Sequence, residues 1–211
     1  MTPTRDLVVA LLAVAIARLA AQDRTVELLR QLADAPGPPG FEESIRRVMV
    51  DQMKPYAASI ALDGMGSTIA MQGTTGPTIM VDAHMDELGG VVRRVTPRGL
   101  LTMQMLGGWL DQALVDQRWI IVGSKGPVHA VTGIRDVHVV PAEERTRVYS
   151  RDSLFLDVGA RDEAEVAAMG IGPGDPVVPA APFTVINGTS NYLAKAWDAP
   201  VGAGAVVEPS R

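Results

Sequence analysis

Apolar residues in the first part of the chain recur with the period of an α-helix. Between residues 25 and 33 they occupy positions 26, 28, 29 and 32, a spacing that predicts an amphipathic helix. A Pro/Gly cluster over residues 35–40 ends this helix, because proline cannot continue the helical hydrogen bonding. The same period returns over residues 41–53, with Glu42 and Glu43 in the first turn, where the helix dipole favours acids. The pattern therefore predicts two helices separated by a rigid turn.

Short apolar runs bounded by glycine and proline follow, and they are typical of strands. Two strands are predicted at residues 59–63 and 67–72, joined by the turn at Gly64–Gly66, and a buried strand at residues 78–81. The remaining predicted strands lie at residues 91–95, 100–105, 119–122, 128–134, 137–140 and 154–158. One short helix is predicted over residues 163–169, with Asp162 as its N-cap and Gly170 just after its last turn.

These elements predict an α/β chain with a β-rich insertion. Residues 24–90 and 187–211 form the α/β part, and residues 91–186 have the closely spaced strands of a small barrel or sandwich. Residues 1–23 form an apolar N-terminal extension, and its apolar stretch, residues 7–17, is too short to span a bilayer. Residues 1–21 fit either a signal peptide, which implies export, or an amphipathic helix, and the sequence leaves both interpretations open.

Composition narrows the chemistry that the chain can perform. With 47% apolar residues in 211 the chain is globular. The net charge is −5 and the basic residues are dispersed, which argues against nucleic acid as a partner. The absence of cysteine excludes disulfides and thiolate metal sites, so any metal would be held by carboxylates and by the three histidines.

The most informative motif follows the predicted strand at residues 78–81. His84 and Asp86 are two residues apart, so they would project to the same side of an extended segment. A carboxylate beside an imidazole is how zinc sites fix the tautomer and orientation of a histidine ligand. The spacing alone also fits a histidine at a strand end that is capped by a neighbouring acid.

Several short stretches follow one another in a fixed order along the chain. They are Ala35–Glu43, Ala83–Gly89, Gly107–Trp109, Gly133–Ile134 with His138 and Glu143–Arg145, Leu156–Gly159, and Lys195–Asp198. Taken together and in this order, they resemble the tetrahedral (TET-type) dinuclear metal aminopeptidases, which include glutamyl and deblocking aminopeptidases, and the resemblance covers roughly residues 25–208.

The resemblance implies a zinc-peptidase-like α/β/α layer, incomplete in this chain, with an inserted dimerisation domain at residues 91–186. It implies that His84 binds one metal, that Asp198 bridges two divalent ions (zinc or cobalt), and that Asp86 orients His84 and assists catalysis. The implied activity is removal of N-terminal residues from peptides through a metal-activated water. Homo-oligomers built through residues 91–186 and a cytoplasmic location are implied as well.

The chain departs from the family pattern after Asp198. The family places a general base within a Glu-Glu pair downstream of the bridging aspartate, and a late histidine completes the metal ligands; neither occurs before Arg211. Glu143 and Glu144 belong to the insertion, and His129 and His138 are expected to have structural or surface roles. The sequence thus predicts a C-terminally truncated chain with weak or absent activity. Pro200 also predicts extended backbone at Ala199, because proline restricts the preceding residue.

Two other functions compete with the aminopeptidase hypothesis. The chain could act as a non-catalytic interaction module that pairs through the β-rich insertion. An endoglucanase activity, a label given to some members of the family, would need two carboxylates such as Asp86 and Asp198. Only 4% of the residues are aromatic, which leaves little surface for stacking against sugars.

Overall fold

The computed structural model describes residues 24–208, which form two compact units. The first unit contains residues up to Ala35, Ile45–Met85, and residues from Trp197 onward. The second unit contains Pro36–Ser44 and Asp86–Ala196. The predicted domain bounds, between residues 90 and 91 and between residues 186 and 187, stay a prediction. The predictions made for residues 1–23 lie outside the described residues.

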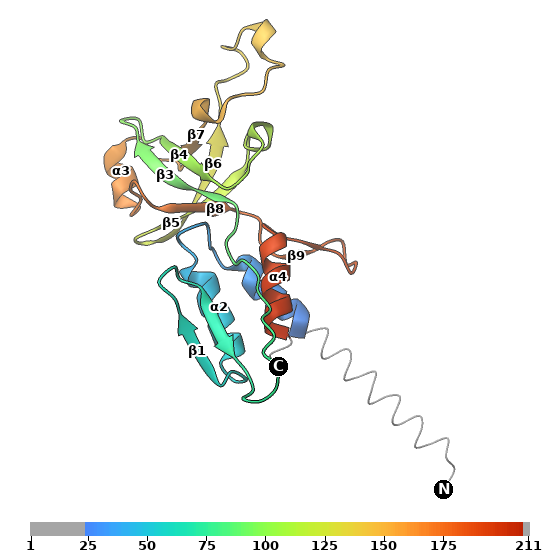
Figure 1. The fold of residues 1–211 in the computed structure, drawn as a ribbon. Coiled ribbons are helices and arrows are strands. Elements are labelled where there is room, and N and C mark those ends of the chain that lie inside the picture. Colours follow the sequence, from blue (N-terminus) through green and yellow to red (C-terminus); the bar gives the residue numbers. More distant parts are fainter. Residues whose placement is uncertain (1–23, 209–211) are drawn as a thin grey trace. The chain divides into compact units, whose positions relative to one another are not determined.

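Within residues 24–208, the first unit is built from three helices and one hairpin (Figure 1). A helix covers residues 24–34, α2 covers Glu43–Met53, and α4 covers Asp198–Val207. Strands β1 (Ser59–Leu62) and β2 (Thr68–Met71) pair antiparallel. The core of this unit consists of Leu28, Leu32, Ile45, Met49, Met53, Ala203 and Val207. The two predicted N-terminal helices and the predicted hairpin are therefore confirmed.

Helix α4 corrects the prediction made from Pro200. The helix begins at Asp198, so Ala199 is helical and not extended. Pro200 is the third residue of the helix, where a backbone N–H has no partner within the helix and its loss costs little. Ala199 is fully buried, and packing against the unit's interior outweighs the local preference before proline.

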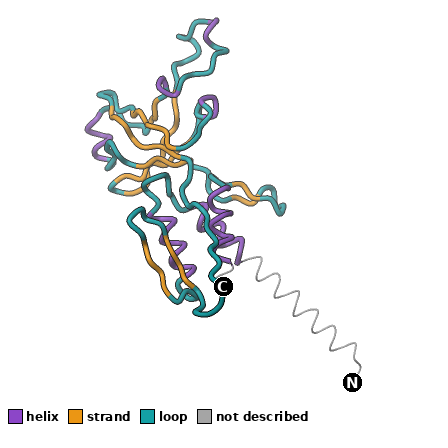
Figure 2. Tube along the Cα trace, viewed as in Figure 1, coloured by secondary structure: helices purple, strands orange, loops and turns teal. Residues whose placement is uncertain are grey.

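The prediction of a strand at residues 78–81 is also wrong. Residues 77–88 form no helix or strand, and Ile79 and Met80 are 82% and 83% exposed. Figure 2 shows this connection as loop. A buried strand needs neighbours on both sides to satisfy its backbone groups, and no strand within residues 24–208 pairs with this segment.

The second unit contains a closed antiparallel barrel, and a small barrel was one of the two β architectures that the sequence predicted. Its strand order is β3-β4-β7-β6-β5-β8. The bounds are β3 Gly89–Val95, β4 Leu101–Leu106, β5 Arg118–Gly123, β6 Gly126–Gly133, β7 Phe155–Asp157 and β8 Pro176–Pro179. Trp119, Leu101, Ile121, Leu156 and Val177 are fully buried in its core. Alternation of buried and less buried positions at the start of β5 points Trp119 and Ile121 inward.

In the second unit, one predicted strand is wrong and one observed strand was not predicted. Residues 137–140 form a turn rather than a strand, because Asp136 accepts hydrogen bonds from the backbone N–H groups of His138 and Val139. This turn belongs to the long loop between β6 and β7, which carries the short 3-10 helices η2 (Ala142–Glu144) and η3 (Arg151–Ser153) (Figure 2). Strand β8 was not predicted, since prolines stand at both of its ends.

The small elements of the second unit complete the fold. Helix α3 (Glu163–Ala168) begins as predicted, with the Asp162 side chain accepting from the N–H of Glu165. Gly170 follows it with a φ of 83°, a left-handed conformation that glycine adopts readily. The unit also contains a 3-10 turn, η1 (Asp111–Ala113), and a small antiparallel hairpin of β9 (Thr184–Val185) and β10 (Tyr192–Leu193). In the described part of the chain, none of the helices has the length and apolar character to cross a membrane.

Candidate metal site

Two predicted metal ligands that are far apart in the sequence lie together in the first unit. His84 Nε2 is 3.7 Å from Asp198 Oδ2, and the two side chains are 54% and 72% exposed. Two ligand atoms, each roughly 2.0–2.1 Å from one tetrahedral zinc ion, lie about 3.3 Å apart. The observed separation is therefore close to what a shared cation needs, and both side chains are open to solvent.

The first unit holds this pair by packing on both sides. Asp198 is the first residue of α4, where the positive end of the helix dipole favours a carboxylate. One turn later a Cβ added at Gly202 would lie 3.2 Å from the Cβ of Ala83. The absence of a side chain at Gly202 therefore lets the residue before His84 lie close against α4. Met85, on the other side of His84, packs against the hydrophobic core of the unit.

The other residues that the sequence singled out do not join a metal cluster. Among residues 24–208, no group of three or more histidine and acidic side chains is placed to hold a metal ion. His129 is exposed on β6, and His138 is exposed in the loop between β6 and β7. Asp86 is half-buried, and its role as an orienting acid stays a prediction.

Sequence reasoning missed a buried ion pair in the second unit. Lys195 Nζ donates to Glu87 Oε1, and the two side chains are only 6% and 4% exposed. The N–H of Gly37 donates to the same oxygen at 2.9 Å, and the N–H of Glu87 donates to the Gly37 carbonyl oxygen at 2.9 Å. Burial raises the pKa of the Glu87 carboxyl, and the charge of Lys195 offsets this only in part. All three residues lie in stretches that carry the family resemblance, so their presence there was the available signal.

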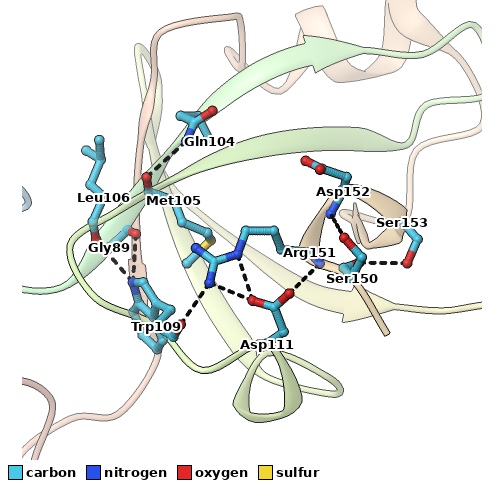
Figure 3. Close-up of polar contacts among 10 residues, drawn as sticks. All are labelled: Gly89, Gln104, Met105, Leu106, Trp109, Asp111, Ser150, Arg151, Asp152 and Ser153. Carbon is cyan, nitrogen blue, oxygen red and sulfur yellow. Dashed lines mark hydrogen bonds and ion pairs between the residues drawn. The ribbon is translucent and has the colours of Figure 1, made fainter. Parts of the chain in front are cut away.

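The Gly107–Trp109 stretch has a structural role in the barrel (Figure 3). The Trp109 indole N–H donates to the carbonyl oxygens of Gly89 and Leu106, at 3.2 and 3.1 Å. Arg151 donates from Nε to Asp111 Oδ1 at 2.7 Å and from a terminal nitrogen to the Trp109 carbonyl oxygen at 2.8 Å. These bonds tie the end of the long β6–β7 loop to the segment after β4.

The sequence of the chain matches known families and known proteins. A family model described as M42 glutamyl aminopeptidase matches residues 66–211, and a second model, described as AMPT, matches residues 23–49. The putative aminopeptidase FrvX of Escherichia coli K12 is 32% identical over 184 residues, which are 87% of this chain and 51% of that protein. The chain thus spans about half the length of the curated relatives it matches.

Solved structures show the same fold. A TET aminopeptidase from the marine sediment archaeon Thaumarchaeota archaeon SCGC AB-539-E09 superposes with a TM-score of 0.85 and 35% identity, covering 90% of this chain and 53% of that one. The TET1 peptidase of Pyrococcus horikoshii, described as assembling into a tetrahedron or a large octahedral shell, has a TM-score of 0.76 and 29% identity over 87% of this chain and 55% of that one. Since the family model covers more than half of the sequence, the chain belongs to the M42 glutamyl aminopeptidase family.

Proposed function

We propose that this chain provides part of the catalytic centre of a metal-dependent aminopeptidase that removes N-terminal residues from peptides. The observation that carries the proposal is the 3.7 Å separation of His84 Nε2 and Asp198 Oδ2 on the surface of the first unit. Family membership supports the class of reaction, because the family is one of metal-dependent aminopeptidases. Two divalent ions, zinc or cobalt, are the proposed cofactors.

His84 and Asp198 supply one imidazole nitrogen and one carboxylate oxygen, a donor set that suits zinc or cobalt. A bound ion of this kind polarises a peptide carbonyl and lowers the pKa of a bound water. In this chain, Asp198 is the first residue of α4, and the close approach of Ala83 to Gly202 fixes the backbone before His84. Asp86 is the proposed partner that fixes the orientation of the His84 ring.

Metal titration of the full 211-residue chain tests the proposal. Isothermal calorimetry with Zn²⁺ should show binding that His84→Ala and Asp198→Asn each weaken by at least about tenfold, or about 1.4 kcal/mol. The matched control is His129→Ala, which removes an exposed imidazole from β6 and should leave the affinity unchanged. Equal affinities in all four proteins would overturn the assignment of the ligands.

Hydrolysis is a separate measurement. Within residues 24–208 no third ligand accompanies His84 and Asp198, so we expect weak occupancy and little turnover. Amino-acid p-nitroanilides with added Zn²⁺ or Co²⁺ should therefore give rates near the blank. Turnover well above the blank would show that other residues of this chain complete the site.

A second candidate function is self-association through residues 91–186. Most of the closed barrel, from within β3 to β8, lies in this range, and its strands find their partners within the barrel. The structurally similar TET1 peptidase is described as forming large shells. Size-exclusion chromatography with light scattering tests whether the chain forms a discrete oligomer.

The endoglucanase alternative is not favoured. The chain belongs to a peptidase family. Asp198 is paired with His84 rather than with a second carboxylate across a sugar site, as a glycosidase would need.

A further inference from the structure

Three segments of the second unit meet at the side chain of Glu87. Its Oε1 accepts from the Gly37 N–H, at 2.9 Å, and from the Lys195 ammonium group. These contacts join the Pro/Gly turn after the first helix, the segment that follows His84, and the segment that precedes Asp198. Glu87 and Lys195, which form this ion pair, are 108 residues apart in the sequence.

Because the Glu87–Lys195 pair is buried, its two charged groups tolerate little displacement from each other. Both side chains are more than nine-tenths buried, so neither charge can be satisfied by bulk water. Glu87 Oε2 is buried and has no hydrogen-bond partner within residues 24–208, so the carboxylate depends on what Oε1 accepts. A buried charge with so few partners is stabilised only when Lys195 and Gly37 are correctly placed.

The backbone on the Lys195 side is also constrained. Ala196 has a φ of 49°, in the left-handed region that residues with a Cβ seldom occupy. The next residue, Trp197, has helical dihedral angles and leads directly into α4. Such a conformation persists only where the flanking contacts impose it, and the buried Lys195 amino group is the flanking contact on one side.

We propose that Glu87 and Lys195 are positioning residues that set the placement of His84 and Asp198 as a ligand pair. The inference rests on the proposed metal-binding function. The coupling runs along the backbone, since Glu87 lies three positions after His84 and Lys195 lies three positions before Asp198. One ion pair thereby restrains the two chain segments that carry the two ligands.

The test uses the full chain and four variants: Glu87→Gln, Lys195→Met, the double variant with both changes, and Asp111→Asn. The double variant removes both buried charges at once, which restores folding where a single change leaves one charge unpaired. Asp111→Asn is the matched control, because it breaks the partly buried Asp111–Arg151 pair of the same unit without touching residues 84–87 or 195–198. Zn²⁺ affinity is measured by calorimetry and unfolding by urea titration.

A second readout needs no metal. The chain has three histidines, so the proton resonance of the His84 ring can be assigned by comparison with His84→Ala. We expect that resonance to shift in both single variants and in the double variant, and to stay in place in Asp111→Asn. Zn²⁺ affinity should fall about tenfold in the same three variants, the loss typical of residues that position a ligand.

The outcomes separate the hypotheses. Wild-type affinity and an unshifted His84 resonance in the double variant would overturn the inference. A loss of affinity that merely follows the loss of unfolding free energy, in Asp111→Asn as in the others, would also overturn it. If His84→Ala itself leaves Zn²⁺ binding unchanged, the proposed function fails, whereas a loss there with unaffected Glu87 and Lys195 variants refutes the positioning role alone.

Discussion

Asp111 and Arg151 show how one ion pair gives a loop a dependence on pH. Hydrogen bonds from the Arg151 side chain, and then from its backbone N–H, lower the pKa of the Asp111 carboxyl below its ordinary value of 3.8 (Figure 3). The folded protein therefore binds this proton more weakly than the unfolded chain does. Its contribution to stability is present above pH 3.8 and is lost as the pH falls through the lower folded pKa.

Asp111→Asn should remove this contribution. The difference in unfolding free energy between wild type and Asp111→Asn should be largest near neutral pH and should shrink as the pH falls below 3.8. Urea titrations followed by tryptophan fluorescence at a series of pH values measure it. A difference that stays constant across the acid range would mean that the carboxylate charge has no part in holding Arg151.

Glu87 and Lys195 mark the limit of inference from single residues. Each lies inside a stretch that carries the family resemblance, yet nothing local shows that two residues 108 apart form a buried pair. His84 and Asp198 could be named because the resemblance assigned each of them a role. The role of Asp86 rests on that resemblance and on the spacing of the two residues, and it stays a prediction.

Strands β5 and β6 are joined in the barrel core by one side-chain hydrogen bond. The Trp119 indole N–H donates to the Thr132 hydroxyl, and both residues are fully buried. Thr132→Val replaces the hydroxyl with a methyl group of similar size and leaves the indole N–H without an acceptor. We expect a loss of about 1–3 kcal/mol in the free energy of unfolding.

Thr102→Val on β4 is the matched control, since it makes the same chemical change at a half-buried position on another strand of the barrel. It should change the free energy of unfolding by no more than about 0.5 kcal/mol. Urea titration of both variants provides the comparison. Equal effects would show that the hydroxyl at residue 132 is not what satisfies Trp119.

The elements that depend on local signals were predictable, and the others were not. Helix α3 follows from Asp162 and Gly170, and the β1–β2 hairpin follows from two short apolar runs joined by a glycine turn. Strand β8 depends on its neighbours β3 and β5, which supply partners to a segment that its own prolines disfavour. Residues 78–81 show the converse, because this apolar run has no strand within residues 24–208 to pair with and forms no strand itself.

At the scale of the whole molecule, both units expose apolar residues, and the most exposed adjacent pair among residues 24–208 lies in the first unit. The barrel is closed and carries a continuous core. The first unit leaves Ile79 and Met80 more than four-fifths exposed, and Leu62, Ile69 and Met71 of its hairpin are about half exposed. Exposed apolar segments of this kind favour non-specific association.

Self-association through residues 91–186 can therefore be separated from association through the first unit. The double variant Ile79→Lys/Met80→Lys adds charge to the exposed apolar segment. We expect it to aggregate less than the wild type with rising concentration, as measured by light scattering. Because neither side chain is buried, the free energy of unfolding should change by no more than about 0.5 kcal/mol. If the proposed assembly uses the barrel unit, the mass of the discrete oligomer should stay the same in this variant. A discrete species that becomes monomeric in the variant would place the contact at residues 79–80, and a wild-type monomer would remove the support for an assembly role.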